Sequence, residues 1–209
     1  MSSAHQKKQR VMIAFDGDNF RDMIRTTGPI DVTKLREVLT DDRHLSDITF
    51  FISVPAEGRL STEQYGFIMT MRQAGIRVKT HRRQKKTNSA DDSTYEVGYP
   101  DGFVFTHIMR NLAHFDTLIL VTRDGDYAFL LDYLSNDMGK HVEVCGITFG
   151  MSWELLNQAQ RFWNLGLMMQ QQEDLRYTKP ERPNNGKLTQ ERLFPTGEEN
   201  LGEEANETP

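Results

Sequence analysis

Two acidic segments have the residue types and the spacing of a divalent-metal site. Asp16 and Asp18 lie one residue apart in AFDGDNF, and Asp124 and Asp126 repeat that spacing in LILVTRDGDYAFLL. Each segment follows an apolar run that predicts a buried strand. Carboxylates gathered at neighbouring strand ends repel one another unless a cation or a proton lies between them. Mg²⁺ and Mn²⁺ prefer such oxygen ligands, so the two segments indicate metal-dependent chemistry on a phosphate ester.

A third acidic residue, Asp101 in YPDGFVF, precedes a predicted helix. It is either the N-cap of that helix or a further ligand from the rim of the sheet. Asp91 and Asp92 in SADDSTYE compete for the ligand role, although their surroundings are typical of a loop. Asp-Gly is also ordinary turn chemistry, so either D-G-D segment alone has a plain structural explanation.

The elements that must position these residues alternate along the chain. Apolar runs predict strands over 11–16, 48–54, 76–81, 117–122 and 141–147. Helical spacing and capping residues predict helices over 31–40, 61–75, 103–115, 126–139 and 152–166. Such alternation predicts an α/β fold, with a parallel sheet covered on both faces and ligands at the carboxyl ends of its strands.

Composition limits the class of protein. The net charge of −5 argues against a uniformly basic nucleic-acid binder, and 37% hydrophobic residues suffice for a core. A single cysteine excludes a disulfide within the chain, and no apolar stretch has the length of a signal peptide or a membrane span. We therefore expect a soluble, cytoplasmic protein with no membrane partner. Three parts are expected: a flexible N-terminus over 1–10, a folded domain over 11–169 and a disordered acidic tail over 170–209.

The segments FDGDNF, the Asp that opens a helix, and DTLILVTRDGDYAFLLDYLSNDMGKHVEV together resemble the NYN domain family, LabA-like branch, of the PIN-like nucleases. The resemblance covers roughly residues 10–165. It implies a Rossmann-like three-layer sandwich with a mostly parallel central sheet, and a metal-dependent ribonuclease that uses Mg²⁺ or Mn²⁺. The metal-binding and catalytic residues that it implies are Asp16, Asp101, Asp124 and Asp126. The supporting residues are Asp18, Asn19, Thr122 and Arg123.

A basic segment, VKTHRRQKK, follows the third predicted strand and is expected to neutralise RNA phosphates, unless it is only a solvated loop. Its candidate nucleic-acid-binding residues are Lys79, Arg82, Arg83, Lys85 and Lys86. Tyr95 and Tyr99, further along, are candidates for stacking on unpaired bases of single-stranded or structured RNA. The methionine-rich stretches FIMTM and LGLMM are more typical of a core or a dimer contact, which leaves a homodimer open.

Departures from the family pattern keep a second function class open. Arg123 replaces a usual glycine, and Gln160 replaces a usual Asp. The helix after Asp101 carries no second carboxylate, with His107 in that region. These features favour a non-catalytic RNA-binding or regulatory module. A third reading is a haloacid-dehalogenase-type phosphatase, whose first motif also opens with D-x-D after a strand, although Asn19 departs from that motif.

Overall fold

The computed structural model describes residues 8–89, 91–98 and 101–178. Its main sheet has six strands in the order β3-β2-β1-β6-β7-β8, and every pair is parallel. The strands are β1 (Arg10–Asp16), β2 (His44–Val54), β3 (Arg77–Arg82), β6 (Thr117–Val121), β7 (His141–Gly146) and β8 (Arg161–Asn164). The predicted parallel sheet is confirmed, and the two strands that end in D-G-D segments, β1 and β6, are neighbours.

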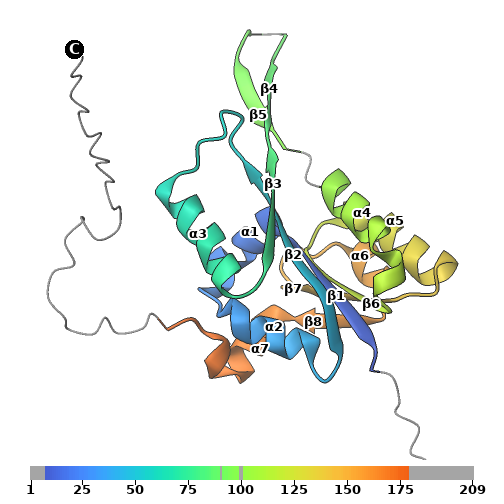
Figure 1. Ribbon diagram of the computed structural model, residues 1–209. Coiled ribbons are helices and arrows are strands. Elements are labelled where there is room, and N and C mark those ends of the chain that lie inside the picture. The colour runs from blue at the N-terminus through green and yellow to red at the C-terminus, as the bar shows by residue number, and fades with distance from the viewer. Residues whose placement is uncertain (1–7, 90, 99–100, 179–209) are drawn as a thin grey trace, which may run out of the picture. The chain divides into compact units, whose positions relative to one another are not determined.

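Helices cover both faces of this sheet (Figure 1). One face carries α1 (Gly17–Thr27), α2 (Val32–Thr40), α3 (Thr62–Gln73) and α7 (Leu165–Gln171). The other carries α4 (Asp101–Arg110), α5 (Ala128–Asp132) and α6 (Trp153–Gln158). The fold is therefore the predicted three-layer α/β sandwich.

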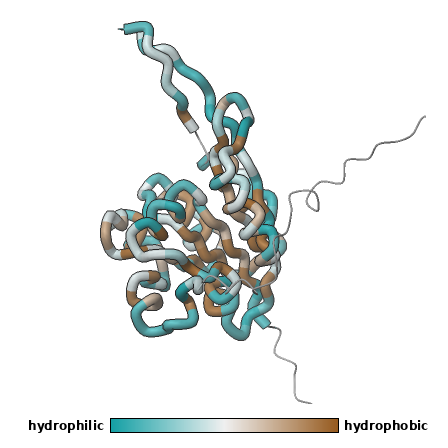
Figure 2. The backbone as a smooth tube through the Cα atoms, turned by 90° about the vertical axis from the view of Figure 1, so that its left-hand side faces the viewer, coloured by the Kyte–Doolittle hydropathy of each residue, from teal (hydrophilic) through white to brown (hydrophobic). Residues whose placement is uncertain are grey.

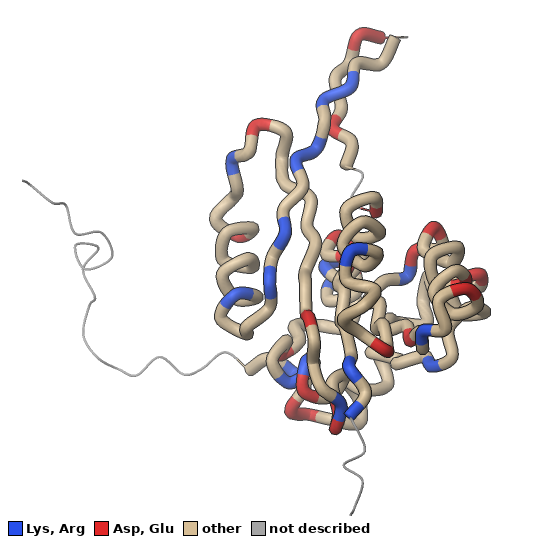
Figure 3. Tube along the Cα trace, turned by 45° about the vertical axis from the view of Figure 1, so that its right-hand side comes forward, with Lys and Arg blue, Asp and Glu red and all other residues tan. Residues whose placement is uncertain are grey.

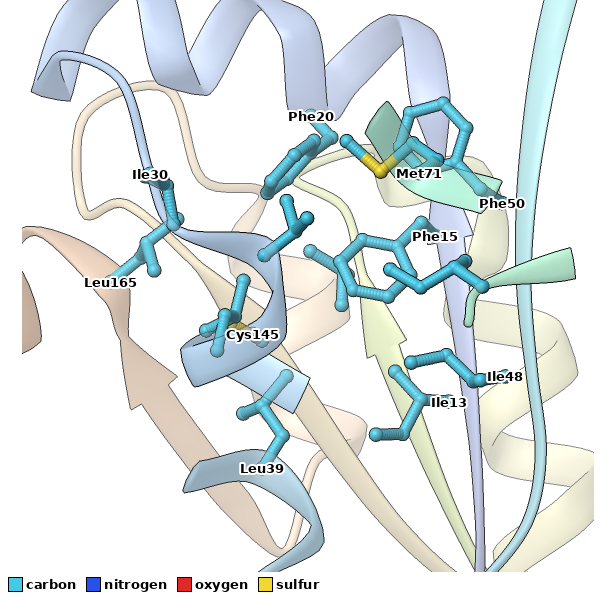
Figure 4. Close-up of a cluster of buried hydrophobic side chains, with 14 of the residues drawn as sticks. Ile13, Phe15, Phe20, Ile30, Leu39, Ile48, Phe50, Met71, Cys145 and Leu165 are labelled. Carbon is cyan, nitrogen blue, oxygen red and sulfur yellow. The ribbon is translucent and has the colours of Figure 1, made fainter. Parts of the chain in front are cut away.

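Alternation along the central strands builds the two cores. In β1, Ile13 and Phe15 face α1–α3, whereas Met12 and Ala14 face α4–α6, and all four are fully buried. Figure 4 shows the first cluster, in which Phe15 lies beside the rings of α1 and β2. Along the tube in Figure 2 the hydrophobic segments concentrate in these strands.

Two helix starts confirm the sequence signals. The Asp31 side chain accepts hydrogen bonds from the first turn of α2. Ser61 and Gln64 form the predicted capping box at the start of α3. These local signals are reliable because they satisfy backbone N–H groups that a helix leaves unpaired.

The structure adds two helices that the sequence did not predict, α1 and α7, and shortens another. Residues 17–27 form α1, which begins directly after β1 at Gly17. A Cβ at Gly17 would lie 2.2 Å from the Phe51 carbonyl oxygen, so only glycine lets α1 begin against β2. The predicted helix over 152–166 is confirmed only in its first part: Ser152 caps α6, which ends at Gln158, and the edge strand β8 follows where the prediction continued the helix. Consecutive aromatic residues in that segment pack better on a sheet than on a short helix.

A second sheet of two antiparallel strands, β4 (Gln84–Thr87) and β5 (Thr94–Val97), was also not predicted. This hairpin extends from β3, and most of it is hydrophilic in Figure 2. Asp91 and Asp92 lie in its turn region, as their loop-like surroundings suggested. Tyr99 lies outside the described residues.

The predicted domain boundary at residue 169 falls inside α7, and Leu175 beyond it is fully buried. The compact unit runs to Thr178. The predicted flexible N-terminus and acidic tail fall largely on residues 1–7 and 179–209, which lie outside the described residues. None of the helices in the described ranges combines the length and the apolar character needed to cross a membrane.

Candidate metal centre

Three carboxylates converge at the carboxyl-terminal edge of the sheet. Oxygen atoms of Asp16, Asp101 and Asp124 all lie within 4.8 Å of one another. Asp16 ends β1, Asp124 follows the neighbouring strand β6, and Asp101 opens α4 on the face that covers both strands. Strand order alone explains the first two, because parallel strands bring their carboxyl ends to one edge.

Asp16 is held in place by a set of donors. Its Oδ2 accepts hydrogen bonds from Asn19 Nδ2 at 2.7 Å and from Thr122 Oγ1 at 3.1 Å. Its Oδ1 accepts one from the Asn19 backbone N–H at 3.3 Å, so Asp16 also serves as the N-cap of α1. Thr122 in turn accepts a hydrogen bond from the Asp124 backbone N–H. Asn19 and Thr122, both predicted to support the site, thus fix one carboxylate and connect it to the next.

Burial makes the ionised form of this cluster costly. Asp16 is only 1% exposed, and burial raises its pKa to about 6, although hydrogen bonds from Asn19 and Thr122 oppose the rise. Burial also raises the pKa of Asp101, and the nearby charges of Asp124, Asp126 and Asp18 add to the rise. Within the described part of the chain, the ion pair at this site joins Arg83 to Asp18 at the rim, and none is formed by Asp16, Asp101 or Asp124. A divalent cation stabilises carboxylates in such a setting.

Tyr127 is a member of the site that the sequence did not predict. Its buried hydroxyl donates a hydrogen bond to Asp101 Oδ1 at 2.9 Å. Burial and the surrounding carboxylates raise the pKa of Tyr127, so it acts as a hydrogen-bond donor at neutral pH. Its signal in the sequence was its place directly after the second D-G-D, since a tyrosine buried there must find a partner for its hydroxyl.

The other predicted acids lie at the rim. Asp126 is exposed and is not part of the three-residue group; its backbone N–H donates to Asp124 Oδ1. Asp18 is half-buried, and its Oδ1 lies 4.0 Å from Arg83 Nη2. Arg123 Nη1 donates a hydrogen bond to the Phe149 carbonyl oxygen at 3.1 Å. Among the predicted residues the structure thus brings three carboxylates together and leaves Asp18, Asp126 and Arg123 around them.

The basic residues form a series along β3 and the hairpin, where blue segments follow one another in Figure 3. Lys79 and Arg82 lie on β3, and Arg83 connects it to β4. Lys85 and Lys86 lie on β4, and Lys85 forms an ion pair with Glu57. Arg83 brings this series to the edge of the carboxylate cluster through its approach to Asp18.

His107 takes no part in the cluster. Its Nε2 lies 2.7 Å from Asp47 Oδ2, and its Nδ1 lies 2.7 Å from Lys79 Nζ. His107 is a buried residue of α4, and its side chain faces β2 and β3. A structural role, which is the commoner one for a lone histidine in a helix, fits these contacts.

Comparison with solved structures supports the fold. The chain is similar to the crystal structure of a protein of unknown function from Vibrio parahaemolyticus RIMD 2210633, with 21% sequence identity and a TM-score of 0.65. The match covers 79% of this chain and 96% of that one. No curated protein matches the chain in sequence. The model of the NYN domain matches residues 10–166, which contain all three converging carboxylates. This chain belongs to the NYN domain family.

Proposed function

We propose that the protein is a metal-dependent ribonuclease that hydrolyses RNA phosphodiester bonds at the Asp16–Asp101–Asp124 cluster. Membership of the NYN domain family implies a PIN-like nuclease fold. The observation that carries the proposal is the convergence of three carboxylates within 4.8 Å, one of them fully buried. We also propose that the chain belongs to the LabA-like branch of this family, because residues 116–144 carry that resemblance.

The residues fit Mg²⁺ or Mn²⁺. All three offer carboxylate oxygens, the donor type that both ions prefer. An ion between them offsets the cost of burial, which is the main cause of the raised pKa of Asp16 and Asp101, and the smaller repulsion between the carboxylates. When bound, such an ion supplies charge neutralisation on a phosphate oxygen and a water of lowered pKa. Asn19, Thr122 and Tyr127 hold Asp16 and Asp101 through hydrogen bonds, so that these carboxylates do not have to reorganise when substrate arrives.

The RNA strand is positioned by the cations of β3 and the hairpin. Lys79, Arg82, Arg83, Lys85 and Lys86 give a series of positive charges on a chain whose net charge is −5. Arg83 lies where this series reaches the acidic rim. Phosphate contacts from such residues fix register and orientation without reading sequence.

Metal-dependent cleavage tests the proposal. The full chain is incubated with labelled single-stranded and hairpin RNAs in Mg²⁺, Mn²⁺ or a chelator. We expect cleavage with metal, none with chelator, and loss of cleavage in Asp124→Asn, which keeps the capping hydrogen bond that Asp124 makes. The exposed Asp137→Asn is the matched control and should cleave as the wild type does.

The second candidate is a non-catalytic RNA-binding module, favoured by the absence of a second carboxylate on α4. Its place is taken by His107, which is committed to Asp47 and Lys79. RNA binding that is indifferent to chelator and to Asp124→Asn, with no cleavage in either metal, would establish this alternative. The phosphatase reading loses support, because the family model that matches is that of the NYN domain.

A further inference from the structure

A cavity lies beside the carboxylate cluster, between β3 and α4. Its volume is about 340 Å³, within the range of small-ligand sites. The residues that line it are Lys79, Gly102, Phe103, Thr106, His107 and Arg110. Gly102 follows Asp101 directly, so the cavity begins where the acidic cluster ends.

The wall of this cavity fixes a lysine ammonium. Lys79 Nζ has hydrogens only to donate, so His107 Nδ1 must accept, and the imidazole proton lies on Nε2 and is donated to Asp47. His107 is 5% exposed, and Asp47 also pairs with Arg77 at 2.8 Å. One of the three ammonium hydrogens is used in this way, which leaves the others for the cavity.

Positive charge accumulates around that ammonium. Burial lowers the pKa of Lys79, and the charges of Arg77 and Arg110 lower it further. Among the described residues, Asp47 is the acid whose charge raises the pKa of Lys79. Cations gathered on an open cavity repel one another, and a bound anion relieves that repulsion. A phosphate is an anion that both Lys and Arg bind through charge-assisted hydrogen bonds.

An exposed aromatic ring, that of Phe103, lines the cavity two residues after Asp101. Phe103 is 53% exposed, and one face of its ring lies against His81, with centroids 4.4 Å apart. Phe103, Thr106 and Arg110 are spaced by three and four residues on α4, which places them along one helix face. A ring and two cations aligned in this way match a base and the phosphate that follows it.

We propose that this cavity is a nucleotide subsite, in which one unpaired nucleotide of the bound RNA stacks its base on Phe103 and places its phosphate against Lys79 and Arg110. The inference rests on the proposed function for its ligand, RNA. It also names a substrate class, because a base held in a duplex cannot stack on a side chain. The strand must therefore be single-stranded where it leaves the carboxylate cluster along α4.

Binding measured in a chelator tests the subsite without depending on cleavage. Fluorescence anisotropy of the full chain is recorded with a short unstructured RNA and with a duplex of the same sequence, over a range of salt concentrations. Phe103→Ala should weaken single-strand binding about tenfold and leave duplex binding unchanged. Phe103→Tyr, which keeps an aromatic face, should restore it.

Arg110→Gln should weaken single-strand binding and reduce the slope of log K against log salt by about 0.7. Matched controls on the opposite helix layer are Tyr65→Ala, a ring of similar exposure at 58%, and Arg25→Gln, and both should bind as the wild type does. Melting curves of each variant confirm that it is folded.

Wild-type binding by Phe103→Ala and Arg110→Gln would overturn the subsite. So would a Phe103-dependent affinity for adenosine monophosphate that equals the affinity for RNA, because the cavity would then hold a free nucleotide. Losses of binding at both positions without metal-dependent cleavage would leave the subsite standing and overturn only the proposed ribonuclease. A wild-type chain that binds no RNA in any of these assays would remove both.

Discussion

Asp16 is both the last residue of β1 and the N-cap of α1, so two backbone elements fix its carboxylate. That position buries it fully, and burial raises its pKa from 3.8 to about 6. Keeping Asp16 ionised therefore costs free energy in the metal-free protein, and a bound cation lowers that cost. Buried ionisable groups of this kind cluster at functional sites.

The pH dependence of stability should show this cost. A folded-state pKa above the unfolded value means that the contribution of Asp16 is full below about pH 4 and is lost as the pH rises through about 6. The loss amounts to about 3 kcal/mol. Urea unfolding in the presence of chelator measures the free energy of unfolding of Asp16→Asn and of the wild type. Between pH 4 and pH 7.5, the wild type should lose about this amount of stability relative to the variant. A difference that does not change with pH would contradict the account.

At the scale of single residues, the sequence predicted part of the site. Asp16 and Asp124 could be found because an acidic residue directly after a buried strand must lie at the carboxyl edge of a parallel sheet. Tyr127 had a local signal, its place directly after the second D-G-D, but Phe103 and Arg110 had none, because their importance depends on which helix face meets which strand. No local pattern carries that information.

At the scale of elements, β8 completes the sheet through one buried acid. Glu143 on β7 is almost fully buried, pairs with Arg43 at 2.7 Å and accepts a hydrogen bond from Trp163 Nε1 of β8 at 2.6 Å. The ring of Trp163 also lies under the Arg161 guanidinium. This long-range network explains why a segment with helical spacing forms a strand instead.

Trp163→Phe should therefore destabilise the protein by about 1.5–3 kcal/mol, the value of a hydrogen bond to a charged group. Trp153→Phe is the matched control, because Trp153 is 73% exposed at the start of α6, and it should change stability by no more than about 0.5 kcal/mol. Urea unfolding followed by circular dichroism measures both. Equal stability of the two variants would mean that β8 is held by other contacts.

The hairpin is an element of a different kind. Every residue of β4 is exposed, and neither core cluster includes any of the described hairpin residues. Gln84 and Val97 are directly paired across it, so a short Gly-Ser linker can replace residues 85–96. We expect the shortened protein to melt close to the wild-type temperature but to bind RNA more weakly, with a smaller salt slope.

The double variant Lys85→Gln, Lys86→Gln separates charge from shape in the same anisotropy assay. It should reproduce most of the loss if the hairpin binds phosphates. Unchanged RNA affinity in the shortened protein would show that the strand does not follow the hairpin.

At the scale of the whole molecule, alternation of strands and helices predicted the three-layer architecture, because parallel strands need crossover helices and buried strands need cover on both faces. The helix α1 escaped prediction although Phe20, Met23 and Ile24 lie at helical spacing, because this apolar stripe is short and follows the acidic segment directly. The hairpin escaped because its strands lack buried residues, and burial is what gives a strand its alternating pattern.

The central claim is that Asp16, Asp101 and Asp124 form one divalent-metal site. Calorimetric titration of the metal-free full chain with Mn²⁺ at neutral pH tests it most directly. We expect saturable binding that each of Asp16→Asn, Asp101→Asn and Asp124→Asn weakens by about tenfold or more, while the exposed Asp137→Asn binds as the wild type does. Absence of Mn²⁺ binding to the wild type, or equal binding by all four variants, would contradict it.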